Sequence, residues 1–397
     1  MDNFKKLKIG IITMYYGSTN YGGNLQAYAL PHFLNKLGYD AKQISYPVTG
    51  ETSGASPMKK FLRNFKKAPI NCFKVVVKTI FRKVKNYFHK KDLRYLENFK
   101  RKKTAAFQNF QLNLIPHTDE IYNDAQLSDT NDDFDVFITG SDQVFNTNLA
   151  KPGYFLNFVN DDKIKISYAA SMALNNIPGD KRQFWKQTLE KYSAISVREE
   201  RTVELLKELT GKDIELTVDP TLLLEASDWN KIASERLINK KYVFCYFLGD
   251  NKDERRAAKE YAQQNHLTLV CIPMRWHNYK QIDLDFGDIN LPFASPEDFI
   301  SLIMHAEYIF TDSFHACVFS LIYKKRFLVF NRDKSNRMNT RIVSLMKLFG
   351  TENRFLSTSE QCSKEKVEAI LSEEALYSYD EFSELKQSSI EFLARNL

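Results

Sequence analysis

The chain of 397 residues is longer than one hydrophobic core usually supports, so the sequence predicts two domains of ordinary size. Its composition excludes extended disorder, a disulfide framework and a structural zinc site, because 43% of the residues are apolar, 26% are charged, and the five cysteines include no CxxC pair. The net charge of +7 is uneven, since residues 58–103 hold 17 Lys and Arg against two acidic residues while the rest is net negative.

The N-terminal sequence alternates between strand and helix patterns. A short apolar run predicts a buried strand over residues 7–14 and is too short for a signal-peptide core. A loop rich in Gly, Asn and Tyr follows, then a helix over 23–37 that Gly38 ends, and a strand over 41–46. No apolar stretch approaches the roughly 20 residues that span a bilayer. The five scattered cysteines fit a reducing compartment, so we expect a cytoplasmic protein.

Residues 58–103 contain the pattern of a cationic amphipathic helix. Apolar residues recur at spacings of three and four on one face, at Phe73, Val77, Ile80, Val84 and Tyr87. Basic residues occupy another face, at Lys74, Lys78, Arg82 and Lys85. Such a helix either packs on the first domain or makes peripheral contact with anionic lipid at the inner face of the cell membrane. Nucleic acid is not an expected partner, because no nucleic-acid-binding motif accompanies the pattern.

The alternation of strands and helices continues to the C-terminus. The remaining elements expected in the first half are strand 135–139, strand 163–173, helix 180–192, strand 194–197, helix 199–210 and strand 214–218. A connector over 218–233 follows, where Pro220 ends a strand and Ser227 or Asp228 caps a short helix. The second half predicts strands 242–248, 267–272, 307–311 and 326–330 and helices 252–265, 296–305, 314–324, 339–348, 364–373 and 380–395. This order predicts parallel sheets covered on both faces.

The economical architecture is α/β, with two Rossmann-like domains facing a cleft and a basic helical insertion near 58–105 in the first. We expect the N-terminal domain to span residues 1–220 and the C-terminal domain residues 221–375, with a C-terminal helix in 376–397. Ligands of such sheets bind outside the carboxyl ends of the strands. Candidate site residues are therefore those that directly follow a predicted strand.

Three loops of the N-terminal domain carry such residues. The stretch "YYGSTNYGGN" (15–24) leads into a helix start, where backbone N–H groups bind anions, and Asn24 there is a candidate substrate ligand. The stretch "TGSDQVFN" (139–146) presents Ser141, Asp142 and Asn146. Asp142 either accepts a substrate proton or caps the next helix. Arg198, at the end of a strand, suits a carboxylate or phosphate, or pairs with a neighbouring glutamate.

The stretch "TDSFHACVFS" (311–320) places a histidine where a strand becomes a helix. Ser313 is a good N-cap, so His315 falls in the first turn, where the helix dipole favours an anionic ligand over a charged ring. A bound phosphate or carboxylate would allow the ring to be protonated and to act as an acid. We interpret His315 as functional, and Cys317 as a small buried residue and not a nucleophile.

The loop after strand 326–330 is rich in cations. Its basic residues are Arg332, Lys334, Arg337 and Arg341. Several guanidinium and ammonium groups on one loop can hold a phosphate, so the stretch predicts a phosphate clamp, with a solvated loop as the alternative.

Taken together, these motifs occur in the same order as in the polysaccharide pyruvyl transferase family, which the chain resembles from about residue 8 to residue 350. The residues that carry the resemblance are "NYGGNLQAYAL", "ITGSDQVFN", "SVREERTVELL", "VDPTLLL" and "TDSFHACVFS" followed by "RFLVF". The resemblance implies a glycosyltransferase-B-like fold. It also implies transfer of the enolpyruvyl group of phosphoenolpyruvate onto a sugar diol of a bacterial surface polysaccharide, giving a pyruvate ketal without a metal or cofactor.

The resemblance also implies roles for individual residues. Arg198 matches the arginine implicated in donor binding, and His315 matches the histidine proposed as the general acid. Lys334 falls where the family often has a basic residue. Asp142 is a candidate acceptor of the sugar hydroxyl proton. The sugar acceptor is expected to be free or linked to a lipid diphosphate.

One motif departs from the family pattern. Many members have Arg-Leu-His-Gly where this chain has Ser313, Phe314, His315 and Ala316. An arginine contact with the donor is therefore missing at Ser313, and Arg337 or Arg341 is the expected replacement. Two alternatives stay open at this level, namely a nucleotide-sugar glycosyltransferase on the same fold and a non-catalytic, membrane-apposed interaction protein.

Overall fold

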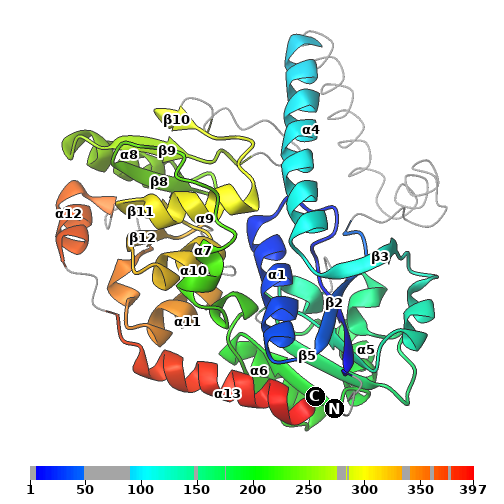
Figure 1. The fold of residues 1–397 in the computed structure, drawn as a ribbon. Coiled ribbons are helices and arrows are strands. Elements are labelled where there is room, and N and C mark those ends of the chain that lie inside the picture. The colour runs from blue at the N-terminus through cyan, green and yellow to red at the C-terminus, as the bar shows by residue number, and fades with distance from the viewer. Residues whose placement is uncertain are drawn as a thin grey trace, which may run out of the picture.

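The computed structural model describes residues 6–48, 90–146, 151–174, 176–274, 283, 286–332, 340–357, 362–373 and 377–397. Two α/β domains follow one another along the chain, each built on one parallel sheet with helices packed against it (Figure 1). Strands such as β8 (Tyr242–Tyr246) are buried at every residue, as parallel strands covered on both faces require. The predicted α/β class with two Rossmann-like domains is confirmed.

The N-terminal sheet has its strands in the order β3-β2-β1-β4-β5-β6-β7, and every pairing is parallel. The strands are β1 (Lys8–Ile12), β2 (Asp40–Ser45), β3 (His117–Ile121), β4 (Val136–Thr139), β5 (Ile164–Ala170), β6 (Ala194–Val197) and β7 (Glu215–Leu216). The strand order reverses at β1, where Ile9 pairs with Ala41 on one side and with Val136 on the other. Such a reversal opens a crevice at the carboxyl ends of the strands.

The helices of this domain are α1 (Tyr21–Lys36), α4 (Lys90–Asn113), α5 (Arg182–Glu190) and α6 (Glu200–Thr210). Helix α1 begins two residues earlier than predicted, because Asn20 is its N-cap and accepts a hydrogen bond from the Gly23 N–H at 3.2 Å. Helix α4 projects from the body of the molecule (Figure 1), and Phe99 on it contacts Phe293 of the C-terminal domain. The cationic helix predicted over residues 73–87 lies outside the described residues.

The C-terminal sheet has the order β10-β9-β8-β11-β12-β13, again with parallel pairings. Besides β8, its strands are β9 (Thr268–Cys271), β10 (Ile289–Asn290), β11 (Tyr308–Thr311), β12 (Arg326–Phe330) and β13 (Phe355–Leu356). The helices are α7 (Ala226–Asn230), α8 (Lys252–Gln264), α9 (Pro296–His305), α10 (Phe314–Ile322), α11 (Thr340–Leu348), α12 (Lys364–Ser372) and α13 (Asp380–Asn396). The strand order reverses at β8, so this sheet also has a crevice at its carboxyl edge.

The two domains are joined by an aromatic contact and by the last helix. Tyr21, at the start of α1, stacks on Phe299 with 4.7 Å between ring centroids and donates a hydrogen bond to the Ala294 carbonyl at 2.7 Å. Helix α13 crosses back to the N-terminal domain (Figure 1), where the Val218 N–H donates to Ser389 Oγ at 3.0 Å. These contacts hold the carboxyl edges of the two sheets close to each other.

Two local predictions were wrong. The cap of α7 is Glu225, not Ser227 or Asp228, and Asp228 completes the capping box from the third helical position. The strand predicted over 214–218 is only two residues long, because the chain leaves the sheet edge after Thr217, whose N–H still donates to the Val197 carbonyl. None of the helices in the described ranges has the length and apolar content to cross a membrane.

Candidate active site

The loop after β4 holds Asp142 in an unusual backbone conformation. Its φ of 61° and ψ of −167° are rare for a residue with a side chain and cost on the order of 1–3 kcal/mol. Buried hydrogen bonds fix the loop, because Thr13 Oγ1 donates to the Ser141 carbonyl at 2.8 Å and Gln26 Oε1 accepts from the Ser141 N–H at 3.0 Å. The carboxylate of Asp142 is thereby aimed at Arg198, and it does not cap the turn that follows.

Arg198, directly after β6, forms a buried ion pair with Asp219. Arg198 Nη1 lies 2.5 Å from Asp219 Oδ2, and both side chains are at most 2% exposed. Arg198 Nη2 lies 3.3 Å from Asp142 Oδ1. Pairing with a neighbouring glutamate, the structural alternative in the sequence, does not occur, because Glu199 bonds instead to Ser171, Met172 and Thr202. Arg198 therefore stays charged inside the protein with two carboxylates beside it.

Asp219 is the residue that sequence reasoning missed. It follows β7 in the stretch "VDP" and accepts hydrogen bonds from the N–H and Oγ1 of Thr221 at 3.1 and 2.7 Å. Burial raises the pKa of Asp219, but contacts with His315, Arg198 and Thr221 outweigh burial and hold the pKa well below its ordinary value. The available signal was its position, since an acid immediately after a predicted strand lies at the same edge as Arg198.

His315 lies in the first turn of α10, as predicted, and its ring packs on the start of α1. A Cβ atom on Gly22 would lie 1.9 Å from His315 Nδ1, so residue 22 must be glycine for the ring to occupy this place. His315 Nε2 lies 3.7 Å from Asp219 Oδ2, which is too long for a hydrogen bond, and this nitrogen has no hydrogen-bond partner among the described residues. The ring is therefore held beside an anion and a helix start with one nitrogen unused.

Two helix N-termini meet at this ring. Within the described ranges, the backbone N–H groups of Gly22 in α1 and of Phe314 and His315 in α10 donate no hydrogen bond. Ser313 occupies the N-cap position of α10, as predicted, although its side chain makes no capping hydrogen bond. Free N–H groups at the positive ends of two helices attract an anion.

Two buried guanidinium groups pack on the Phe314 ring. The ring centroid lies 4.7 Å from the Arg198 guanidinium carbon and 5.9 Å from that of Arg341. Arg341 is 8% exposed, and it forms no ion pair or hydrogen bond with any residue that the structure describes. Burial and the nearby charge of Arg198 lower the pKa of Arg341 to about 10. Of the other cations predicted on this loop, Lys334 and Arg337 lie outside the described residues, and Arg332 donates to the Asp312 carbonyl at 2.9 Å.

The other predicted ligands take structural positions. Asn24 is fully buried, donates to the Ser18 and Asn20 carbonyls and accepts from Gln111, so it stabilises the glycine-rich loop. Asn146 is also buried and donates to Gln143 Oε1 at 3.0 Å. Ser141, by contrast, reaches the site, since its Oγ lies 3.2 Å from Asp219 Oδ2.

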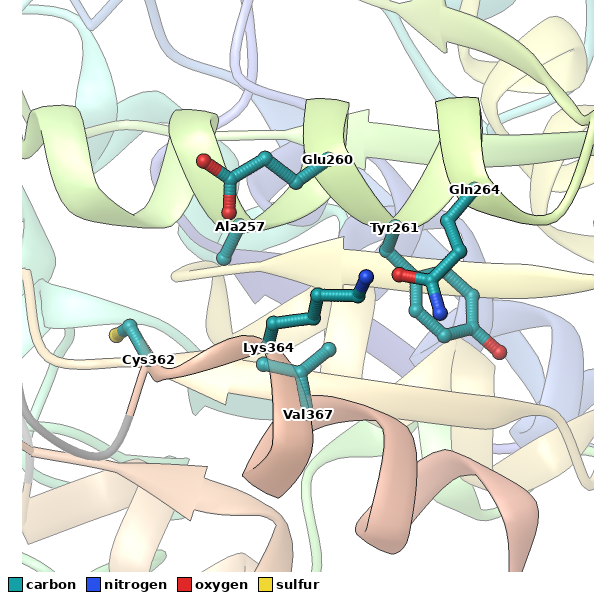
Figure 2. Close-up of a pocket in the computed structure, with 7 residues that line it drawn as sticks. All are labelled: Ala257, Glu260, Tyr261, Gln264, Cys362, Lys364 and Val367. Carbon is teal, nitrogen blue, oxygen red and sulfur yellow. The ribbon is translucent and has the colours of Figure 1, made fainter.

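A cavity of about 80 Å³ opens beside these residues, under α13 and between the two domains. Its walls include Arg198, Asp219, Phe314 and Arg341. A much smaller cavity, of about 10 Å³, lies between α8 and α12 far from this cluster (Figure 2) and has room for about one water molecule. The larger cavity is the one that can hold a ligand.

Two other chemistries have little support here. Cys317 is fully buried, and burial raises the pKa of its thiol well above the ordinary value, which disfavours a thiolate nucleophile. Over the described ranges, no three His, Cys, Asp or Glu side chains gather in a way that could hold a metal ion.

Comparisons with known proteins fit this geometry. The sequence profile of the family described as polysaccharide pyruvyl transferase matches residues 20–334. No curated protein matches the chain in sequence. A solved UDP-GlcNAc 2-epimerase from Methanocaldococcus jannaschii is similar in structure, with a TM-score of 0.51, 11% identity, and coverage of 98% of this chain and 99% of that one. The UDP-N-acetylglucosamine 2-epimerase from Rickettsia bellii has a TM-score of 0.51, 12% identity, and coverage of 98% and 96%.

At these identities the structural likeness establishes the fold and nothing about activity. That fold is the glycosyltransferase-B type, in which two Rossmann-like domains face each other, as the sequence predicted. The profile match includes Arg198, Asp219 and His315, the three residues that the structure brings together between the domains.

Proposed function

The chain belongs to the polysaccharide pyruvyl transferase family, and from this we propose that it transfers the pyruvyl group of phosphoenolpyruvate onto two hydroxyls of a sugar as a ketal. The observation that supports this best is His315, a buried imidazole with a free Nε2 beside the Arg198–Asp219 ion pair. An acid close to cations and free N–H groups is what an enol phosphate requires. We expect no metal or cofactor to take part.

The donor carries two anionic groups, a carboxylate and a phosphate. We propose that Arg198 and the free N–H groups of Gly22, Phe314 and His315 hold one of them, because they converge from both domains. Arg198 is already neutralised by Asp219 and Asp142, so its role is to orient the anion by directional hydrogen bonds. The free N–H groups add the attraction of two helix ends.

The proposed reaction consists of two additions to one carbon. His315 donates its proton to the methylene carbon of the enol, and the oxygen of the first sugar hydroxyl bonds to the neighbouring carbon while Asp142 accepts the hydroxyl proton. The bond from that carbon to the phosphate oxygen then breaks, and phosphate leaves with the proton that Asp142 accepted from the first hydroxyl, which regenerates the Asp142 carboxylate. The second hydroxyl bonds to the same carbon, and its proton returns to His315. The groups required are one acid, one base and cations, and all three are present.

Ligand binding tests this proposal against the nucleotide-sugar alternative. At a concentration 100 times its dissociation constant, a ligand stabilises the folded state by about 2.7 kcal/mol, which raises the melting temperature by roughly 5–10 °C. We expect phosphoenolpyruvate to produce this shift and uridine or guanosine diphosphate to produce none. A shift with a nucleoside diphosphate alone would support the glycosyltransferase and refute the pyruvyltransferase.

We further propose that the acceptor sugar is carried on a lipid diphosphate at the inner face of the cell membrane. The support is the cationic pattern within residues 58–103, where each basic residue near an anionic surface contributes about 1 kcal/mol. The wild-type protein is then expected to sediment with vesicles that contain anionic lipid and not with neutral ones. Exchange of Lys74, Lys78, Arg82 and Lys85 for glutamate should abolish sedimentation, and equal behaviour of both proteins contradicts the membrane contact.

A further inference from the structure

Arg341 is a buried cation without an anion. The residue is only 8% exposed, yet no carboxylate of the described residues lies within ion-pair distance of its guanidinium. Its Nε has no hydrogen-bond partner there either. Burying an unpaired charge costs several kcal/mol, so proteins retain one where a ligand supplies the opposite charge. Arg198, which also packs on the Phe314 ring, is different because Asp219 and Asp142 compensate its charge.

The cavity under α13 is where this charge is accessible. Arg341, Ser344 and Lys347 contribute to its walls from α11, and Glu200 and Glu381 line it as exposed residues. Its volume of about 80 Å³ has room for several water molecules, at roughly 10–15 Å³ for each. A phosphate group fits this space.

The cavity and the candidate acid share walls. Phe314 lines the cavity, and its ring centroid lies 5.1 Å from that of His315. Asp219 also lines the cavity, and its Oδ2 lies 3.7 Å from His315 Nε2. Phe314 and Asp219 therefore lie between the cavity and His315, which is not itself a lining residue.

We propose that this cavity is the phosphate subsite, in which Arg341 pairs with the phosphoryl group of the donor or with free inorganic phosphate. Both guanidinium groups pack on the Phe314 ring, and in this proposal Arg198 orients the carboxylate while Arg341 binds the phosphate. The phosphate site itself does not depend on the proposed reaction. Its assignment to a donor rests on that proposed function.

The test compares two buried arginines in the full-length protein. Arg341→Met removes the unpaired charge, so the ligand-free variant should melt several degrees above wild type, and inorganic phosphate should no longer raise its melting temperature. Arg354→Met is the matched control, because Arg354 is 2% exposed and stacks 5.9 Å over the Phe327 ring, but does not line the cavity. Arg354 also donates to the Phe327 carbonyl, so its variant should melt lower and keep the phosphate response.

Titrations with phosphate, pyruvate and phosphoenolpyruvate separate the outcomes. Loss of the phosphate response in Arg341→Met, with the pyruvate response kept, supports the subsite. A phosphate response that survives in Arg341→Met, or that is absent in wild type, overturns it. A variant that loses the pyruvate response and keeps the phosphate response overturns it too. If wild type responds to phosphoenolpyruvate no more strongly than to phosphate, the subsite stands and the proposed donor is wrong.

Discussion

Replacement of His315 by glutamine is expected to lower the rate of pyruvyl transfer by about 10²–10⁴-fold, the usual contribution of a positioned acid. Glutamine fills much of the space of the ring beside Gly22 and still offers a hydrogen-bond donor, but it cannot release a proton to carbon. Binding of phosphoenolpyruvate, measured by calorimetry, should change little, because the arginines and helix ends that hold the anions remain. The rate is measured as phosphate released in the presence of acceptor sugar.

His32→Gln is the control for this experiment. His32 lies on α1 and stacks on Tyr28 with 5.0 Å between ring centroids, so it is another histidine packed on an aromatic ring, away from the site. Its variant should release phosphate at the wild-type rate. A His315→Gln protein within a few-fold of wild type would show that another group protonates the donor.

Local sequence rules were sufficient to predict the positions of most helices and central strands. Helix α9 has the predicted bounds, because Pro296 and the Ser295 and Asp298 capping box determine its start from adjacent residues. The short strands β10 and β13, of two residues each, carry no such signal, since they exist only through pairing with β9 and β12. The cap of α7 was assigned to the wrong residue because Glu225 is a weak N-cap by composition.

The sequence predicted those site residues that can be identified by their position after a strand. Arg198 directly follows β6, and His315 lies in the first turn of the helix after β11, so the rule about the carboxyl edges of parallel sheets identifies both. The carboxylate that neutralises Arg198 is determined by how the segment after β7 packs. The sequence alone therefore could not select Asp219 over Glu199 as this partner. The burial of Arg341 depends on helix α13 covering the cavity, a contact between segments far apart in the chain.

Asp219 therefore contributes both to the stability of the fold and to the arrangement of the candidate active site. It is the closest anion to His315 Nε2 and the closest to the Arg198 guanidinium, so one carboxylate positions both groups. It also bonds to Thr221 at the start of the connector that leads to the second domain. A substitution at Asp219 is expected to affect the folded state and the site together.

Asp219→Asn is expected to lower the free energy of unfolding by about 3–5 kcal/mol, because the variant leaves the Arg198 charge buried with only the more distant Asp142 beside it. It should also reduce phosphate release at saturating donor, since Arg198 and His315 lose their common anchor. The control is Asp283→Asn, which breaks the equally buried pair of Asp283 with Arg255 at 2.7 Å, away from the site. The control should lose stability and keep the rate per folded molecule.

The pH dependence of stability provides an independent check of Asp219. Its pKa in the folded state lies below that of the unfolded state, so the ionised carboxylate stabilises the protein at pH values above about 4. That stabilisation is lost as the pH falls toward the folded-state pKa. The difference in unfolding free energy between wild type and Asp219→Asn, measured with urea, should therefore be largest near pH 7 and shrink below pH ~4. A difference that is constant from neutral to acidic pH would mean that the charge of Asp219 contributes nothing to stability, and the ion pair could not then be what positions His315.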